Sequence, residues 1–208
     1  MSQQHRTFFA GRRPPHRVSL LTAIAFGLAL PQMSLASAAH AQSATIPASL
    51  QAELLAKLEA YDRTFAKRAG SAAHVLIVVK PGSAKSELSA NEMRAALKRV
   101  ERIGGLPHQE TLVEYAGAAD LAQRCRTEHI AIVFVAADLD DAVDAIRAAL
   151  SSVDVLSVGA QPSYIAKGIV LGFELESGRP KIVINLEQAK RQNVGFSSDV
   201  LRLMRVQR

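Results

Sequence analysis

Two uninterrupted apolar runs constrain the fold of this chain more than any other feature. Residues 74–80 (HVLIVVK) and 130–136 (IAIVFVA) contain no polar side chain except the terminal His74 and Lys80. An apolar run of this length suits a strand that is covered on both faces, as in a parallel sheet packed between helices. The two runs therefore predict an α/β sheet with helices on both sides.

The segments around these runs predict helices and strands in alternation. Apolar residues at spacings of three and four predict a helix from Leu50 to Phe65. Ser89 and Glu92 form an S-x-x-E capping box, which predicts that the next helix begins there. Further helices are predicted at 118–127 and 138–150, and further strands at 110–115 and 154–158. The second of these helices would carry Asp138, Asp140 and Asp141 in its first turn, where the helix dipole favours acidic residues.

The last third of the chain departs from this alternation. Extended segments at 168–175 and 181–186 flank the turn sequence E-S-G-R, which predicts a hairpin, and helices are expected near 187–192 and 198–205. The predicted fold class is therefore α/β. It is a single three-layer domain with a mostly parallel sheet, a C-terminal antiparallel hairpin and a packed N-terminal helix. The domain should span residues 49–208 and follow a mobile stretch at 42–48.

Residues 1–41 are typical of a cleavable secretion signal. Four arginines precede the apolar run 18–30, and an A-x-A site formed by Ala39 and Ala41 precedes Gln42. The run is shorter than the roughly 20 apolar residues that a membrane-spanning helix needs. We therefore predict cleavage after Ala41, a periplasmic location and no membrane anchor after cleavage. Mass spectrometry of the exported protein should give Gln42 as its first residue, and an intact leader would contradict the prediction.

Removal of the leader changes the charge balance. The whole chain carries 25 basic and 19 acidic residues, a net charge of +6. The leader contains four arginines and no acidic residue, so the mature chain keeps a net charge of only +2. A nucleic-acid-binding domain usually shows a basic stripe. The near balance of charge therefore gives no reason to expect a nucleic-acid partner.

Motifs that carry chemistry are incomplete in this chain. Lys85 and Ser86 follow a predicted strand as in a phosphate-binding loop, but Val79 and Ala84 occupy the required glycine positions. The triplet His108-Gln109-Glu110 matches half of a zinc deaminase signature without its cysteine half. We therefore predict no catalytic residue, no metal and no cofactor, and a protein that is not an enzyme. Cys125 is the only cysteine, so an intramolecular disulfide is excluded, and we expect its thiol to be buried.

Residues 155–206 resemble the C-terminal half of the YfiR/HmsC-like periplasmic proteins. The matching features are the motifs V-L-S-V, G-I-V-L-G-F, I-N-L and S-S-D-V-L-R-L, and residues 60–70 (AYDRTFAKRAG) also look like a subgroup of that family. Gly168, Asn185 and Ser198 lie in or beside these motifs, and we expect structural roles for them. Gly168 would permit a tight backbone, Asn185 would bond unpaired backbone groups, and a serine would cap the last helix.

This resemblance implies regulation. Relatives bind the extracytoplasmic part of an inner-membrane diguanylate cyclase and hold it inactive, which lowers cyclic-di-GMP and biofilm formation. The implied partner is therefore an inner-membrane sensor or diguanylate cyclase, and a homodimer is possible. Better-known members carry redox-active cysteine pairs, and the single Cys125 does not support that property here. The alternative is a periplasmic small-ligand-binding protein that serves a sensor or transporter, because parallel sheets bind ligands beyond the carboxyl ends of their strands.

Overall fold

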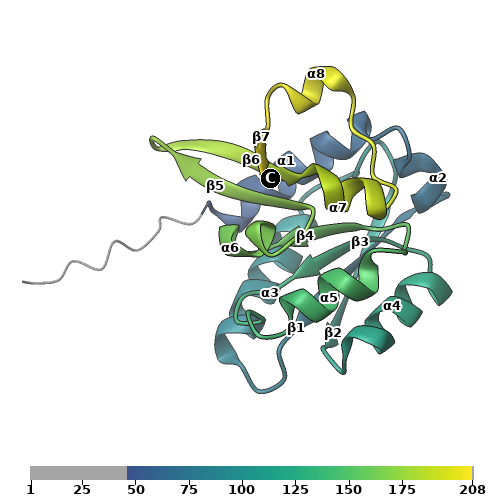
Figure 1. Cartoon of the computed structure of the whole chain (residues 1–208), viewed down its shortest axis with the longest axis vertical. Helices are drawn as coiled ribbons and strands as arrows, with labels where there is room; N and C mark the ends of the chain where they lie inside the picture. The colour runs from purple at the N-terminus through teal and green to yellow at the C-terminus, as the bar shows by residue number, and fades with distance from the viewer. Residues whose placement is uncertain (1–45, 208) are drawn as a thin grey trace, which may run out of the picture. The chain divides into compact units, whose positions relative to one another are not determined.

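A seven-stranded sheet forms the centre of the computed structural model, which describes residues 46–207 (Figure 1). The strand order is β2-β1-β3-β4-β5-β6-β7. Strands β1 to β5 are mutually parallel, β6 runs antiparallel to β5, and β7 runs parallel to β6. The strands are β1 (Ala73–Val79), β2 (His108–Glu114), β3 (Ile130–Val135), β4 (Leu156–Gly159), β5 (Leu171–Glu176), β6 (Arg179–Asn185) and β7 (Arg205–Gln207).

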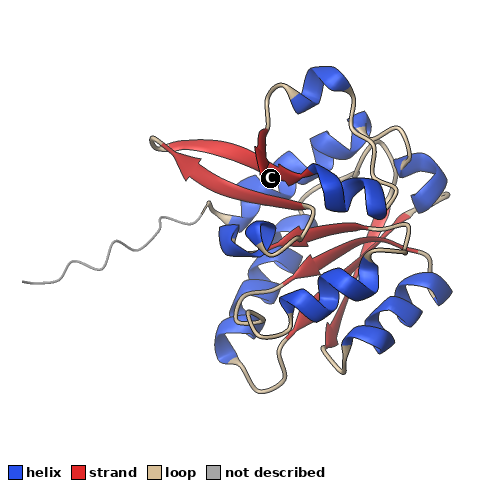
Figure 2. Ribbon diagram, viewed as in Figure 1, coloured by secondary structure: helices blue, strands red, loops and turns tan. Residues whose placement is uncertain are grey.

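Helices cover both faces of this sheet (Figure 2). They are α1 (Ala48–Leu58), η1 (Glu59–Tyr61), α2 (Phe65–Ala69), α3 (Ala84–Leu97), α4 (Ala118–Thr127), α5 (Val143–Leu150), α6 (Pro162–Ala166), α7 (Leu186–Arg191) and α8 (Ser198–Leu201). One core joins the sheet to α1, α2, α3, α7 and α8, and a second joins it to α4, α5 and α6. Alternate residues of β1 enter the two cores, which explains why its sequence is apolar without interruption. The predicted α/β fold class is confirmed.

The N-terminal boundary lies earlier than predicted. Ile46 is buried and Ala48 already begins α1, so residues 46–48 belong to the domain instead of forming a mobile entry. The Nε2 of Gln51 donates to the carbonyl of Ile46 at 2.7 Å, which fixes this segment against α1. Residues 42–45 and the cleavage residues Ala39, Ala41 and Gln42 lie outside the described part of the chain.

The capping box at Ser89 and Glu92 was a wrong prediction. Helix α3 begins at Ala84, and the Oγ of Ser83 accepts the first-turn bond from the amide of Ser86 at 3.1 Å. Ser89 lies inside the helix, where its Oγ accepts a 3.3 Å bond from the amide of Ala137. Ser83, and not Ser89, therefore caps the helix, and the same Ser83 hydroxyl also donates to Asp138 in the loop after β3.

The predicted position of the three aspartates after β3 was also wrong. Helix α5 begins at Val143, so Asp138, Asp140 and Asp141 belong to the preceding loop and not to a helical first turn. Asp138 has a φ of +68°, and its Oδ2 accepts a 2.6 Å bond from the Oγ of Ser83. Asp141 pairs with Lys80 at 3.1 Å. These bonds hold the loops that follow β1 and β3 together.

The C-terminus ends in a strand instead of the predicted helix. Helix α8 stops at Leu201, and β7 then pairs with the outer edge of β6. The guanidinium of Arg205 donates to both carboxylate oxygens of Glu174, at 2.6 and 2.7 Å. Because this bidentate bond joins residues far apart in the sequence, periodicity within residues 198–205 could not reveal it.

Replacing Cys125 by serine is expected to lower the free energy of unfolding by about 1–2 kcal/mol, because a buried hydroxyl would lack a good partner. Cys125 packs in the second core, and burial raises the pKa of its thiol to about 12. Urea denaturation of the serine and alanine variants measures the effect, since alanine introduces no hydroxyl. A serine variant as stable as the wild type would contradict this account.

Candidate binding cleft

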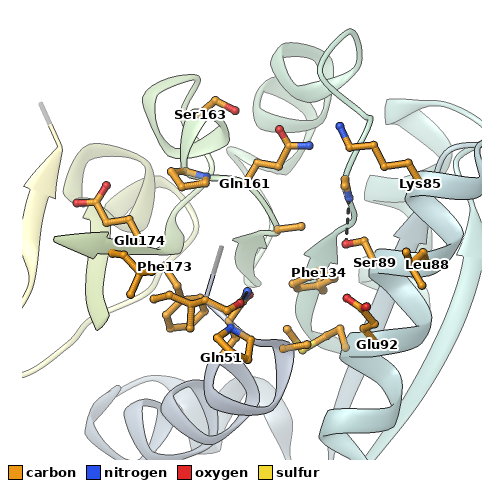
Figure 3. Close-up of a pocket in the computed structure, with 18 of the residues that line it drawn as sticks. Gln51, Lys85, Leu88, Ser89, Glu92, Phe134, Gln161, Ser163, Phe173 and Glu174 are labelled. Carbon is orange, nitrogen blue, oxygen red and sulfur yellow. Dashed lines mark hydrogen bonds between the residues drawn. The ribbon is translucent and has the colours of Figure 1, made fainter. Parts of the chain in front are cut away.

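A cleft of about 960 Å³ lies beyond the carboxyl ends of β3 and β4 (Figure 3). It is built from α1 with the residues before it, α3 between Lys85 and Met93, the start of α6 with the residues before it, and β5 from Phe173 with the turn that follows. The lining residues used below are Ile46, Gln51, Lys85, Leu88, Ser89, Glu92, Met93, Phe134, Gln161, Ser163, Phe173, Glu174 and Leu175. Segments far apart in the sequence therefore meet at one edge of the sheet.

The lining divides into apolar and polar parts. Ile46, Met93, Phe134 and Phe173 are nearly inaccessible to solvent and supply apolar side chains from α3, β3, β5 and the residues before α1. In Figure 3 the side chains of α3 lie across the cleft from Phe173 and Glu174 of β5, with Phe134 between the two walls. Such a mixture of apolar surface and a few separated polar groups is typical of a binding site.

The polar groups of the cleft leave several bonding positions open. Lys85 and Glu92 lie on the same wall of α3, and neither forms an ion pair with a described residue. Glu174 differs, because Arg205 neutralises it. Gln51 is only 6 % exposed, and its Oε1 has no hydrogen-bond partner among the described residues. A buried amide oxygen without a donor costs free energy, which an occupant of the cleft could recover.

The hairpin wall extends beyond the strand beside it. Strand β5 pairs with β4 only at Leu171 and Gly172, and then continues outward with β6 (Figure 1). Ser177 and Gly178 connect the two strands with φ values of +52° and +75°. Positive φ at both central residues identifies the two-residue turn that matches the twist of a hairpin. The hairpin is therefore a well-formed arm that projects past the carboxyl edge of the sheet.

A buried ion cluster lies at a separate place, in and directly before the family-like segment 60–70. The guanidinium of Arg68 donates to Glu59 at 3.0 Å and to Asp62 at 2.7 Å, and the three side chains are at most 3 % exposed. Arg68 also donates to the carbonyl of Ala131 in β3, and Asp62 accepts from the amides of Thr64 and Gly195. The cluster thus joins η1, α2, β3 and the C-terminal segment. It explains why the predicted single helix 50–65 is broken at Asp62.

The two carboxyl groups of this cluster have pKa values that are shifted in opposite directions. Burial raises the pKa of Glu59 to about 8, although the charge of Arg68 opposes that rise. Burial also disfavours the charge of Asp62, but the Arg68 cation and the bonds from Thr64 and Gly195 outweigh it and lower the pKa of Asp62. Asp62 is therefore the main counter-ion of Arg68, and Glu59 holds a proton more readily.

The residues singled out in the family motifs lie outside the cleft lining. Asn185 precedes α7, and its Oδ1 accepts from the amide of Gln188 at 2.9 Å. Gly168 ends α6 with a φ of +98°, where its amide donates to Ile165 and a Cβ would collide with Arg147. Ser198 is the first residue of α8, and the residue before it, Ser197, makes no side-chain capping bond.

Sequence reasoning named the carboxyl edge of the sheet as the place for a ligand, but it identified none of the residues of the cleft. Lys85 was considered only as the lysine of a phosphate-binding loop, Glu92 only as part of a capping box, and Gln51 showed no distinguishing pattern. The sequence does contain one relevant signal: the predicted first strand of the hairpin, 168–175, is longer than the predicted strand 154–158, so it could extend past that strand. His108 and Glu110, the two residues that matched half of a zinc deaminase signature, pair with each other at 2.6 Å and do not line the cleft. In residues 46–207 no three His, Cys, Asp or Glu side chains gather as a metal site would require.

Comparison with protein families identifies the group to which the chain is related. The YfiR/HmsC-like family model matches residues 48–205, nearly all of the described part. The chain belongs to the YfiR/HmsC-like family. This membership confirms the resemblance found in the sequence motifs. No helix within residues 46–207 has the length and apolar character to cross a membrane, and no curated protein matches the chain significantly.

Solved structures share the fold at low sequence identity. A conserved domain protein from Vibrio cholerae matches with 13% identity and a TM-score of 0.54, covering 78% of this chain and 60% of that chain. The ABC domain in complex with L-Trp from Streptococcus pneumoniae matches with 14% identity and a TM-score of 0.54, covering 77% and 60%. A ligand-free, open substrate binding protein with adhesive properties from Clostridium difficile matches with 11% identity and a TM-score of 0.50. That match covers 70% of this chain and 57% of that chain. This chain therefore spans about 60% of the length of the first two, and the likeness concerns the fold alone.

Proposed function

We propose that the mature protein is a periplasmic regulator that binds the extracytoplasmic part of an inner-membrane diguanylate cyclase and represses it. Membership of the YfiR/HmsC-like family across residues 48–205 carries the proposal. The secretion signal predicted at residues 1–41 is consistent with it, because the site of contact would lie outside the cytoplasm. The regulator would lower cyclic-di-GMP and biofilm formation.

The cleft supports binding as the mode of action, without catalysis. Its unpaired charged groups, Lys85 and Glu92, lie seven residues apart on α3, about 10 Å along the helix axis. A general acid or base works within hydrogen-bond reach of a second reacting group. Groups that far apart suit the recognition of an extended occupant better than proton transfer at one atom.

Genetic removal of the protein tests the proposal. Deletion of the gene should raise cyclic-di-GMP and surface attachment, because the cyclase would lose its repressor. Additional removal of the partner cyclase should restore both to the normal level. If deletion alters neither quantity while the mature protein is present and folded in the parent strain, the regulatory proposal is wrong.

A second candidate function is the binding of a small ligand on behalf of a sensor or transporter. The position of the cleft favours it, since ligands of doubly wound α/β sheets bind beyond the carboxyl ends of the strands. Its volume of about 960 Å³ also lies within the range of small-molecule sites. Tight calorimetric binding of a metabolite by the mature protein, together with unchanged cyclic-di-GMP on deletion, would select this function.

A further inference from the structure

The wall of the cleft formed by β5 contains an unused strand edge. Strand β6 pairs with all six residues of β5, whereas β4 pairs only with Leu171 and Gly172. Beyond that point no described strand lies beside β5 on the β4 side. The outer half of β5, from Phe173 to Glu176, therefore presents one open edge, and Phe173, Glu174 and Leu175 also line the cleft.

The register shows which backbone groups this edge offers. The amide of Asn185 donates to the carbonyl of Val170, its opposite residue, so the even-numbered residues of β5 direct their backbone groups toward β6. The odd-numbered residues direct theirs toward the other edge. Leu175 lies opposite Pro180, which has no amide hydrogen, as expected for a pair that exchanges no bond across the ladder. The amide and carbonyl of Leu175 therefore face the open edge.

The rims of the cleft are apolar and accessible. Leu88 of α3 is 62 % exposed and Leu175 of β5 is 36 % exposed. They are two of the five large apolar side chains that are exposed within residues 46–207, and both line the cleft. Apolar rims that face solvent suit an occupant that extends over them, such as a protein segment. A small molecule bound against the buried apolar residues Phe134 and Phe173 would leave Leu88 and Leu175 exposed to solvent.

We propose that an extended segment of the partner protein adds to the open edge of β5 as an additional strand. This inference rests on the proposed function and specifies how the partner is recognised. Main-chain bonds to Leu175 would supply affinity, and alternate side chains of the segment would enter the apolar cleft at Phe134 and Phe173. Strand addition uses backbone groups that an edge leaves unpaired.

The charges on α3 define the chemistry of the segment further. Lys85 and Glu92 are about 10 Å apart along the helix axis, a distance that about three residues of an extended chain span. The segment should therefore carry an acidic residue near Lys85 and a basic residue near Glu92, with apolar residues between them. The Oε1 of Gln51 would accept a donor from the same segment.

Two pairs of variants of the mature protein test the inference. Leu175→Pro removes the amide at the open edge and keeps the ladder to β6, whereas Leu175→Val keeps the amide. Leu88→Glu places a charge on the cleft rim, whereas Leu203→Glu places it on a residue that is 72 % exposed and does not line the cleft. The probe is the purified extracytoplasmic domain of the cyclase whose removal reverses the deletion phenotype.

The expected result is a loss of affinity of about ten-fold or more for Leu175→Pro and Leu88→Glu, and a change below about two-fold for the two controls. The complex should also slow hydrogen exchange at the amide of Leu175. Wild-type affinity of Leu175→Pro and Leu88→Glu would overturn the inference, as would unchanged exchange at Leu175.

The other occupants and the proposed function give distinguishable results. If Leu175 becomes protected in the protein alone as its concentration rises, the occupant is a second copy and the inference is wrong. If a small metabolite protects the cleft from hydrogen exchange and the cyclase domain does not, the inference is likewise wrong.

The deletion strain separates the inference from the proposed function. When deletion raises cyclic-di-GMP and the Leu175→Pro protein restores the normal level fully, strand addition is wrong and the regulatory function stands. When deletion changes nothing, both fail.

Discussion

Replacing Arg68 by methionine is expected to lower the free energy of unfolding by about 3–5 kcal/mol. The change would leave Glu59 and Asp62, both fully buried, without their shared cation. It would also remove the donor to the carbonyl of Ala131 in β3. Removing one member of a buried ion cluster is costly because the remaining charge stays buried without compensation.

Urea denaturation at pH 7 measures this effect. Lys67→Met is the matched control, since Lys67 is the exposed neighbour of Arg68 on α2 and is expected to change stability by less than about 0.5 kcal/mol. Nearly equal losses in the two variants would contradict a structural role for the cluster. The Arg68→Met variant should lose less at acidic pH, where the carboxyl groups can take up protons.

The stability of the domain is expected to fall as the pH rises from about 5 to about 8. Burial raises the pKa of Glu59 from its ordinary 4.5 to about 8, so the folded protein keeps a proton that the unfolded chain releases in this interval. A group with a raised pKa stabilises the fold most below its unfolded pKa, and that contribution disappears as the pH passes its folded pKa. Because one pKa unit corresponds to about 1.4 kcal/mol, the decline should amount to about 2–4 kcal/mol.

Asp62 acts in the opposite sense and in a different interval. Its pKa is lowered, so its contribution is present above its unfolded pKa of 3.8 and is lost only as the medium becomes more acidic. Glu59→Gln imitates the protonated carboxyl and should remove most of the decline between pH 5 and 8, whereas Glu53→Gln, on an exposed position of α1, should retain it. An unchanged slope in the Glu59→Gln protein would show that another group titrates.

The order of elements could be predicted because burial on two sides leaves a strong trace in the sequence. The apolar runs that became β1 and β3, and the glycine-containing turn at residues 177–178, are local signals with a direct physical cause. Element ends were predicted less well where distant contacts decide them. Ser83 caps α3 and also donates to Asp138, which is 55 residues away, and the motif at Ser89 does not indicate that contact.

The carboxyl edge of the sheet was the expected place for a ligand, but the residues of the cleft could not be predicted, because they have ordinary neighbours in the sequence. Gln51 lies in an amphipathic helix, and its burial follows only from where α1 meets the carboxyl edge of the sheet. The open edge of β5 depends on β4 ending at Gly159, which is a property of pairing and not of composition. Family motifs such as Asn185 mark turns that hold the fold, so they indicate membership better than they indicate the site.

The central claim is that the mature protein represses an inner-membrane cyclase by direct contact outside the cytoplasm. The most direct test is cyclic-di-GMP synthesis by the purified cyclase in proteoliposomes, with residues 42–208 added on the extracytoplasmic side. The account predicts that synthesis falls in proportion to the occupied cyclase, and that Leu88→Glu protein is a poor inhibitor. Undiminished synthesis in the presence of excess, folded wild-type protein would contradict the claim.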